Sequence, residues 1–126
     1  MVKAKRLETG KRAEKRGRRS EVLAAMLLRC KGYRILGRRV RNHAGEIDLV
    51  AQSLTGVLCF VEVKARPEDT LAAQAVGLRQ RARIVRAAEL YLAGRPTAKG
   101  VRFDVVTVTP GRWPRHLRDA WRPDGS

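Results

Sequence analysis

Acidic residues are scarce in this chain of 126 residues, which has 12 Asp and Glu against 28 Lys and Arg and a formal net charge of +16. A surface of that sign attracts polyanions, and the usual polyanion is nucleic acid. Structural RNA-binding proteins share this profile. The composition therefore indicates a class of partner and leaves the activity open.

Cysteine and long apolar runs are also scarce. Cys30 and Cys59 are the only cysteines, without CxxC spacing, and their apolar surroundings predict two core residues, not a disulfide or a metal pair. No apolar run reaches the ~18–20 residues of a membrane span, and the basic N-terminus lacks the apolar stretch of a signal peptide. We therefore expect no membrane contact and a location in the reducing cytoplasm.

Other patterns that carry chemistry are missing. The glycines form neither GxGxxG nor GxxxxGK, which excludes the common phosphate-cradling loops. His43 and His116 stand alone, with no ligand spacing around them, and are expected at the surface or in turns. Trp113 and Trp121 can either stack on bases or pack the end of the chain, and packing is the expected use.

The length of the chain fits one domain around one core. We expect a flexible basic N-terminus over residues 1–11, a single folded domain over residues 12–110 and an irregular tail over residues 111–126. Six of the nine residues from 11 to 19 are Lys or Arg, with Arg18 and Arg19 among them. This run is either a solvated arm or an arm that contacts phosphate.

Hydrophobic patterning and turn residues predict six elements in the order αβββαβ, which is a mixed α/β fold with helices beside a central sheet. The first helix is apolar on all sides and is therefore expected to be buried, with Glu21 at its start, where the helix dipole favours an acid. The predicted elements are a helix over 21–30, strands over 33–41, 45–51 and 57–65, a helix from 78 to about 94, and a strand over 101–109.

The second and third strands carry charged residues that need an explanation, because a buried charge is costly unless it is paired or bound to a metal. Alternation places Asp48 on the face opposite Ile47 and Leu49. A hairpin through residues 52–56 brings Asp48 to the same face as Glu62 and Lys64.

Two neighbouring carboxylates suit Mg²⁺, or Mn²⁺, which take oxygen ligands and complete their shell with water and phosphate. Lys64 would then lie at the rim, where it can orient the attacking water or neutralise charge on the phosphate. The alternative is a simple cross-strand salt bridge on a solvated face of the sheet.

Arginines supply the expected contacts with nucleic acid, with DNA as the favoured form. Arg39 and Arg41 end the first strand, and Arg79, Arg83 and Arg86 form one stripe on the second long helix, at spacings of i, i+4 and i+7. A solvated face and a phosphate-contacting face both fit this stripe.

The segments GEIDLVA and CFVEVKAR, with KGYRILGRRVR upstream and RFDVV downstream, resemble the YraN family of small bacterial proteins over residues 17–108. The resemblance implies the restriction-endonuclease-like, or PD-(D/E)xK, fold of Holliday-junction resolvases, with Asp48, Glu62 and Lys64 as the catalytic set. It also implies that Glu21 is a further metal-site carboxylate. Many proteins with this fold act as dimers, so a homodimer is compatible with the resemblance.

The sequence departs from the family pattern at three places. Ser20 precedes Glu21 where the family has Gly, Gln80 stands where the family has Lys, and Arg39 stands where it has Asn. None of these changes touches the Asp, Glu and Lys of the catalytic set. The sequence therefore predicts a metal-dependent endonuclease, with a non-catalytic nucleic-acid-binding protein as the main alternative and a structural RNA-binding protein as a weaker one.

Overall fold

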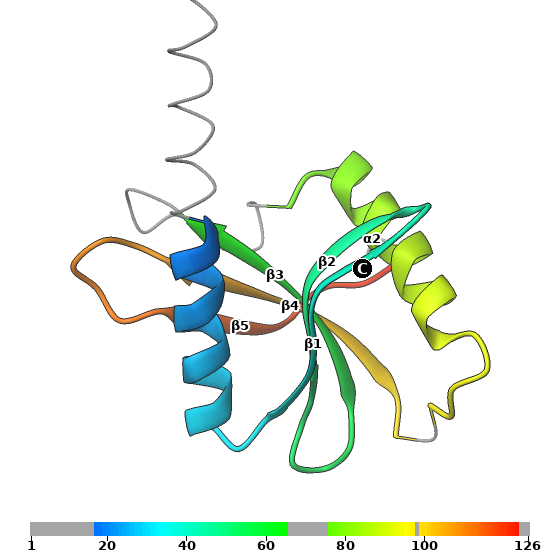
Figure 1. The fold of residues 1–126 in the computed structure, drawn as a ribbon, viewed down its shortest axis with the longest axis horizontal. Coiled ribbons are helices and arrows are strands. Elements are labelled where there is room, and N and C mark those ends of the chain that lie inside the picture. The colour runs from blue at the N-terminus through cyan, green and yellow to red at the C-terminus, as the bar shows by residue number, and fades with distance from the viewer. Residues whose placement is uncertain (1–16, 66–75, 98, 124–126) are drawn as a thin grey trace, which may run out of the picture.

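The patterned segments form two helices and five strands in the part of the chain that the structure, a computed structural model, describes: residues 17–65, 76–97 and 99–123 (Figure 1). The predicted flexible N-terminus over residues 1–11 lies outside the described residues. The elements are a helix over residues 17–30, called the first helix here, β1 (Arg34–Asn42), β2 (Gly45–Gln52), β3 (Leu58–Ala65), α2 (Leu78–Leu92), β4 (Val101–Val108) and β5 (Arg115–Trp121).

The strands form one mixed sheet in the order β1-β2-β3-β4-β5. Strands β1, β2 and β3 are antiparallel neighbours, and their short connections allow this because antiparallel strands need only a tight turn. Strand β4 runs parallel to β3, and α2 lies on the connection between them. The predicted α/β class and the order αβββαβ are thus confirmed from the first helix to β4.

The end of the chain differs from the prediction. Residues 115–121 form β5, antiparallel to β4, within the segment that was expected to be an irregular tail. Most of this edge strand is exposed, and its arginines hide the alternation that normally identifies a strand. Trp121 is the buried residue of β5 and stacks on Phe103 of β4, with ring centroids 4.4 Å apart, so packing is its use. Trp113 is 75% exposed.

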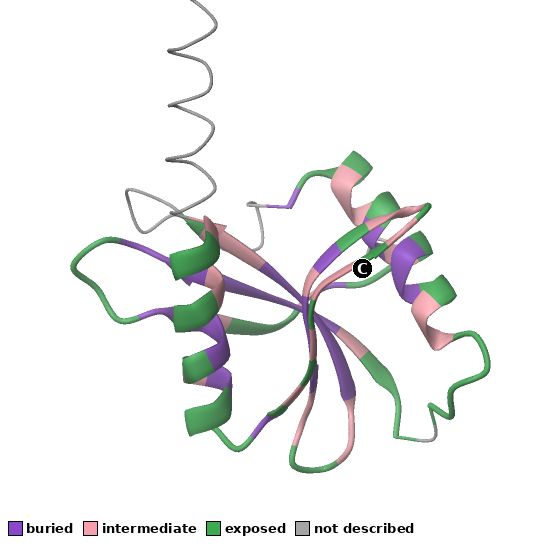
Figure 2. Ribbon diagram, in the orientation of Figure 1, coloured by how far each residue is buried: buried purple, intermediate pink, exposed green. Residues whose placement is uncertain are grey.

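The sheet has one core on each face. The first helix covers one face and α2 covers the other, and the buried residues concentrate where β3 and β4 cross the middle of the molecule (Figures 1 and 2). Cys59 and Val61 of β3 pack towards the first helix, whereas Phe60 packs towards α2. A strand buried on both faces reads as a continuous apolar run, which is the pattern that begins β3.

The first helix is buried on one side only, which corrects the prediction of a helix buried all round. Small Ala24 and Ala25 contact the core, whereas Val22 and Met26 are 43% and 53% exposed. Cys30 is exposed as well, so only Cys59 fits the prediction of two core cysteines. Among the described residues, this helix has more apolar side chains than its contacts with the sheet bury.

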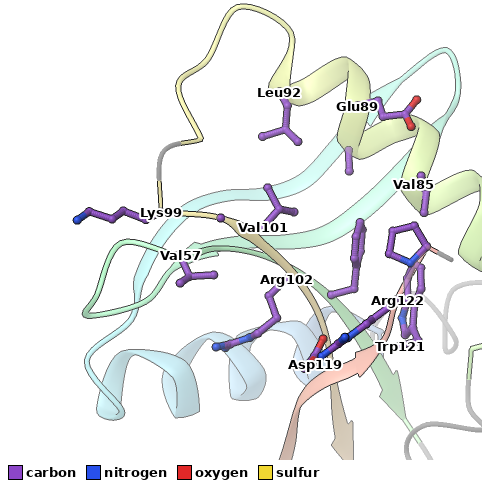
Figure 3. Close-up of a pocket in the computed structure, with 14 residues that line it drawn as sticks. Val57, Val85, Glu89, Leu92, Lys99, Val101, Arg102, Asp119, Trp121 and Arg122 are labelled. Carbon is purple, nitrogen blue, oxygen red and sulfur yellow. Dashed lines mark hydrogen bonds and ion pairs between the residues drawn. The ribbon is translucent and has the colours of Figure 1, made fainter. Parts of the chain in front are cut away.

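A cavity of about 740 Å³ lies between α2 and the beginning of β4, away from the predicted catalytic residues (Figure 3). Val85, Leu92 and Val101 give it an apolar lining, and the labelled side chains of Lys99 and Glu89 project away from it. In the described ranges, neither helix combines the length and the hydropathy that crossing a membrane requires.

Candidate functional site

The predicted carboxylates meet where the ladder between β2 and β3 ends. Leu49 opposite Val61 is the last pair of that ladder, so Asp48 and Glu62 are the next residues on the two strands. The backbone N–H of Val63 donates to Asp48 Oδ2 over 2.8 Å. The side chain of Asp48 thus bridges to β3 at the point where the ladder between the backbones stops.

Strand β1 is irregular at the same level. Arg38 pairs with Leu49 and Val40 pairs with Ile47, so Arg39 lies level with Asp48. Its φ is +49°, a left-handed conformation that is uncommon for residues other than glycine and that Asn adopts more readily. In this chain an arginine takes this conformation, at the position where the resemblance implies an Asn.

Beyond this point the β1–β2 hairpin turns towards α2. Ile47 packs in the same cluster as Val50, which corrects the predicted alternation that placed it with Leu49. The side-chain amide of Asn42 donates to the carbonyl oxygen of Ala87 over 3.1 Å and fixes the tip of the hairpin on α2. The bend is a tertiary contact that a period of two residues does not encode.

Burial disfavours the charged forms of Asp48 and Glu62. The pKa of Glu62, which is 8% exposed, rises to about 8 because burial and then the nearby Asp48 disfavour its charge. Burial is also the main cause that raises the pKa of Asp48, and the N–H of Val63 opposes it. The charge of Asp48 disfavours a second charge on Glu62, so the pair favours a state in which Glu62 holds a proton.

Gln80, in the first turn of α2, joins Glu62 to Lys64. Its Nε2 donates to Glu62 Oε1 over 2.7 Å, and its Oε1 accepts from Lys64 Nζ over 3.0 Å. Lys64 Nζ also lies 3.5 Å from Glu62 Oε1. The amide of Gln80 thus holds both charged residues that the sequence predicts on β3. From the sequence alone, Gln80 was notable only as a departure from the family pattern.

Glu21 lies close enough to raise the pKa of Asp48, but its carboxylate forms an ion pair with Arg39, with 2.7 Å between Oε2 and Nε. The described residues contain no cluster of three or more His, Cys, Asp or Glu side chains suited to a metal. The structure therefore brings two predicted ligands together, and the role of Glu21 as a third stays a prediction. A half-buried and a buried carboxylate that repel one another fit a hard divalent cation, since Mg²⁺ commonly binds one or two carboxylates.

The predicted phosphate-contacting arginines do not form one surface. Arg18 and Arg19 are exposed on the first helix, whereas the stripe of Arg79, Arg83 and Arg86 is exposed on α2, across the sheet (Figure 1). A last group sits at the β1–β2 hairpin: Arg41 is exposed and lies 3.5 Å from Glu46, and the half-buried Arg39 is paired with Glu21.

A second polar cluster lies between β4, β5 and the end of the first helix. Asp104 is fully buried and accepts hydrogen bonds from Arg102 and from His116 Nε2, which lies 2.8 Å away. The side chain of His116 is only 2% exposed, so the expectation of a surface histidine is wrong. The signal available in the sequence was Asp104, an acid within the β-branched run of β4. Its partner His116 comes from the segment that was expected to be irregular.

Residues 20–108 match the family described as Uncharacterised protein family UPF0102. The chain belongs to this family. A UPF0102 protein of Parvibaculum lavamentivorans is 51% identical over 117 residues, covering 91% of this chain and 87% of that protein, and one of Maricaulis maris is 49% identical over 118 residues, covering 92% of each. The resemblance to the YraN family is thereby confirmed.

One solved structure, that of Pyrococcus furiosus SfsA in complex with Ca²⁺, is similar at 13% identity, a TM-score of 0.29 and coverage of 79% of this chain and 60% of that one. A likeness at this level bears on neither the site nor its chemistry.

Proposed function

We propose that this UPF0102 protein is a metal-dependent endonuclease that hydrolyses phosphodiesters in DNA, and branched DNA in particular. The observation that carries the proposal is the pairing of the half-buried Asp48 with the buried Glu62, with Lys64 held beside them by Gln80. A protein that only binds nucleic acid has no use for adjoining acids, because they repel phosphate.

Each residue then has a role. Asp48 and Glu62 would hold Mg²⁺ or Mn²⁺, which when bound supplies a Lewis acid for the phosphate and a more acidic water. Lys64 would orient the attacking water or neutralise charge that develops on the phosphate oxygens. Gln80 bridges the Lys64 ammonium and the Glu62 carboxyl group, whose ion-pair atoms lie 3.5 Å apart, and holds both at fixed positions.

The beginning of α2 suits the phosphate that is to be cut. Gly77 precedes the helix with an extended backbone and offers no side-chain cap, and the first turn of α2 contains no acid. Free N–H groups and the positive end of the helix dipole bind anions. Gln80 lies in that turn and contacts Glu62, so the anion-binding end of α2 borders the acidic pair. The exposed arginines of α2 and of the hairpin would extend the contact along the backbone, in the cytoplasm.

The decisive experiment incubates the full chain with branched, single-stranded and duplex DNA, with and without Mg²⁺ or Mn²⁺. We expect metal-dependent cutting that Asp48→Asn and Lys64→Ala both abolish. Glu46→Gln is the matched control, because Glu46 is an exposed acid on the same strand. Salt-sensitive binding without cutting, or cutting that persists in both variants, would replace this proposal with the non-catalytic binder.

A further inference from the structure

A line of hydrogen bonds runs from the interior to the surface on the other side of the molecule from α2. Fully buried Asp104 accepts two bonds from the guanidinium of Arg102, each 2.8 Å long, and one from the N–H of Asp119 over 2.9 Å. His116 Nε2 lies 2.8 Å from Asp104 Oδ2, and Lys31 Nζ lies 2.5 Å from His116 Nδ1. Lys31 itself is exposed.

With Lys31 as an ammonium, its contact with His116 assigns the ring proton to Nε2. An ammonium group has only donor hydrogens, so Nδ1 of the ring accepts from Lys31. The ring proton is then on Nε2, where it is donated to Asp104. In this tautomer Nδ1 is a proton acceptor that faces the amine of Lys31 directly, with the buried carboxylate of Asp104 behind the ring. Nucleophile, base and orienting acid follow one another here in the order that activates nucleophiles in enzymes.

The charges around Lys31 favour its neutral form. Burial, and then the exposed Arg118, lower the pKa of the Lys31 amine from its ordinary value, with Arg102 adding to the effect and Asp104 opposing it. An amine that loses its proton more easily, and that has a base in contact, reacts with electrophilic carbon. The position at the surface leaves this amine accessible to a large molecule.

The geometry points to a nucleophilic amine at Lys31 that forms an imine with an aldehyde, namely the ring-opened sugar of an abasic site in nucleic acid. Arg118 beside the amine offers a partner for the neighbouring phosphates, and the net charge of +16 draws the polymer to the protein. The choice of nucleic acid rests on the proposed function, whereas the reactivity of the amine does not.

The reaction balances without an oxidant or a metal. The ammonium of Lys31 passes a proton to His116 Nδ1, and the amine nitrogen bonds to the aldehyde carbon. The attacking nitrogen passes a second proton to the aldehyde oxygen and His116 returns the first one to it, so the oxygen leaves as water and aldehyde and ammonium give iminium and water. Transfer of a proton from the adjoining sugar carbon to water then expels the 3′-phosphate and breaks the carbon–oxygen bond. Water hydrolyses the imine and restores the amine.

Reductive trapping tests this inference. The full chain is incubated with a labelled duplex that holds one abasic site, in excess EDTA and with sodium cyanoborohydride, which reduces the imine to a stable secondary amine. We expect a covalent adduct that peptide mass spectrometry locates on Lys31. Lys31→Arg should slow its formation at least tenfold, whereas Lys99→Arg, at another exposed lysine, should leave the rate within twofold. His116→Gln should slow trapping and change its dependence on pH.

Two outcomes would overturn the inference: an adduct located on another amine, or trapping by Lys31→Arg at the rate of the unaltered chain. Free 2-deoxyribose 5-phosphate forms a second arm, and labelling of Lys31 by this sugar without reaction of the duplex would overturn the assignment to nucleic acid. Because EDTA removes divalent cations, trapping is independent of the proposed nuclease. A chain that traps the abasic site but never cuts DNA with Mg²⁺ would reject that function and keep this one.

Discussion

Gln80 and Glu62, 18 positions apart in sequence, are joined by a hydrogen bond of 2.7 Å from the amide Nε2 to the carboxyl Oε1. The same amide accepts from Lys64, so one neutral side chain positions both charges of β3. A lysine at this position, which the resemblance implies for the family, would compete with Lys64 for the acid. This chain instead has a group that both donates and accepts.

We expect Gln80→Ala to lower the proposed DNA cleavage by ~10-fold or more, as removal of a group that orients metal ligands commonly does. The turnover number should fall more than the Michaelis constant changes, because the amide holds groups and does not touch DNA. Gln80→Glu should be worse, because it adds a third acid beside Glu62. Steady-state kinetics measure this, and an unchanged turnover in Gln80→Ala would contradict the positioning role. Arg86→Gln, further along α2, should lower the affinity for DNA and leave the turnover number unchanged.

The raised pKa of Glu62 makes metal binding depend on pH. With a pKa of about 8, the Glu62 carboxyl is protonated at neutral pH in the metal-free protein, and a cation must displace that proton. Affinity for Mn²⁺ should therefore rise from pH 6 to pH 8 and level off above it, with close to one proton released per ion at pH 7. Isothermal titration calorimetry in buffers of different ionisation enthalpy counts that proton, and Glu62→Gln should abolish its release.

The same group predicts how stability depends on pH without metal. Glu62 has a pKa of about 8 when folded against an ordinary value of 4.5, so the folded chain holds the extra proton between these values. Stability then falls as pH rises from about 4.5 to 8, since the folded state binds more protons and its free energy rises relative to that of the unfolded state. Urea unfolding at pH 5, 6.5 and 8 in EDTA measures this. A stability that increases over this range would contradict the assigned pKa, and saturating Mg²⁺ should reverse the trend.

Most of this fold was predictable from sequence because its elements are locally encoded. Apolar runs bounded by turn residues define β2, β3 and β4, and Gly77 marks the beginning of α2. The meeting of Asp48 and Glu62 was predictable too, because a hairpin allows one register that buries both apolar faces. Local pattern and tertiary pairing agree in that part of the chain.

What could not be predicted depends on contacts between distant segments. Strand β5 forms because β4 offers an edge, and its own residues show no alternation. The amide of Gln80 reaches Glu62 only because α2 packs with its first turn over the end of β3. His116 is buried by Asp104 and Lys31, and the second of these is 85 positions away. No period within one segment carries such information.

The ion pair between Glu21 and Arg39 leads to a test of the third predicted ligand. If Glu21 binds the metal, Glu21→Gln should weaken the binding of Mn²⁺ as severely as Asp48→Asn does. We expect the affinity for Mn²⁺ to fall by less than ~10-fold instead, because the Glu21 carboxylate already forms an ion pair with Arg39 at 2.7 Å. Calorimetric titration of both variants decides this. Arg39→Asn is the companion variant, because Asn tolerates the left-handed backbone and removes the ion-pair partner of Glu21. The affinity of this variant for Mn²⁺ shows what the Glu21 carboxylate contributes once it is unpaired.

Asp48→Asn should also stabilise the metal-free protein, although it removes a proposed ligand. An amide oxygen still accepts from the N–H of Val63, while the buried charge beside Glu62 is lost. We expect the free energy of unfolding at pH 8 to rise, because the unfavourable interaction between the two carboxyl groups is removed. Glu46→Gln, at an exposed position, should change it by less than ~0.5 kcal/mol. Destabilisation by Asp48→Asn would mean that the acid serves the fold and not a cation.

Asp104 should be the acid on which the fold depends most. It receives hydrogen bonds from Arg102, His116 and the backbone of Asp119, and the pKa of its carboxyl is lowered despite burial because these donors favour the charged form. Asp104→Ala leaves Arg102 without its carboxylate and frees β5, and breaking a buried pair of this kind costs ~3–5 kcal/mol. Asp119→Asn is the control, because its side chain only meets exposed Arg122 over 3.1 Å and Asn tolerates its positive φ. Urea unfolding should separate the two variants by several kcal/mol, and equal stabilities would show that β5 is held by the apolar stacking of Trp121 alone.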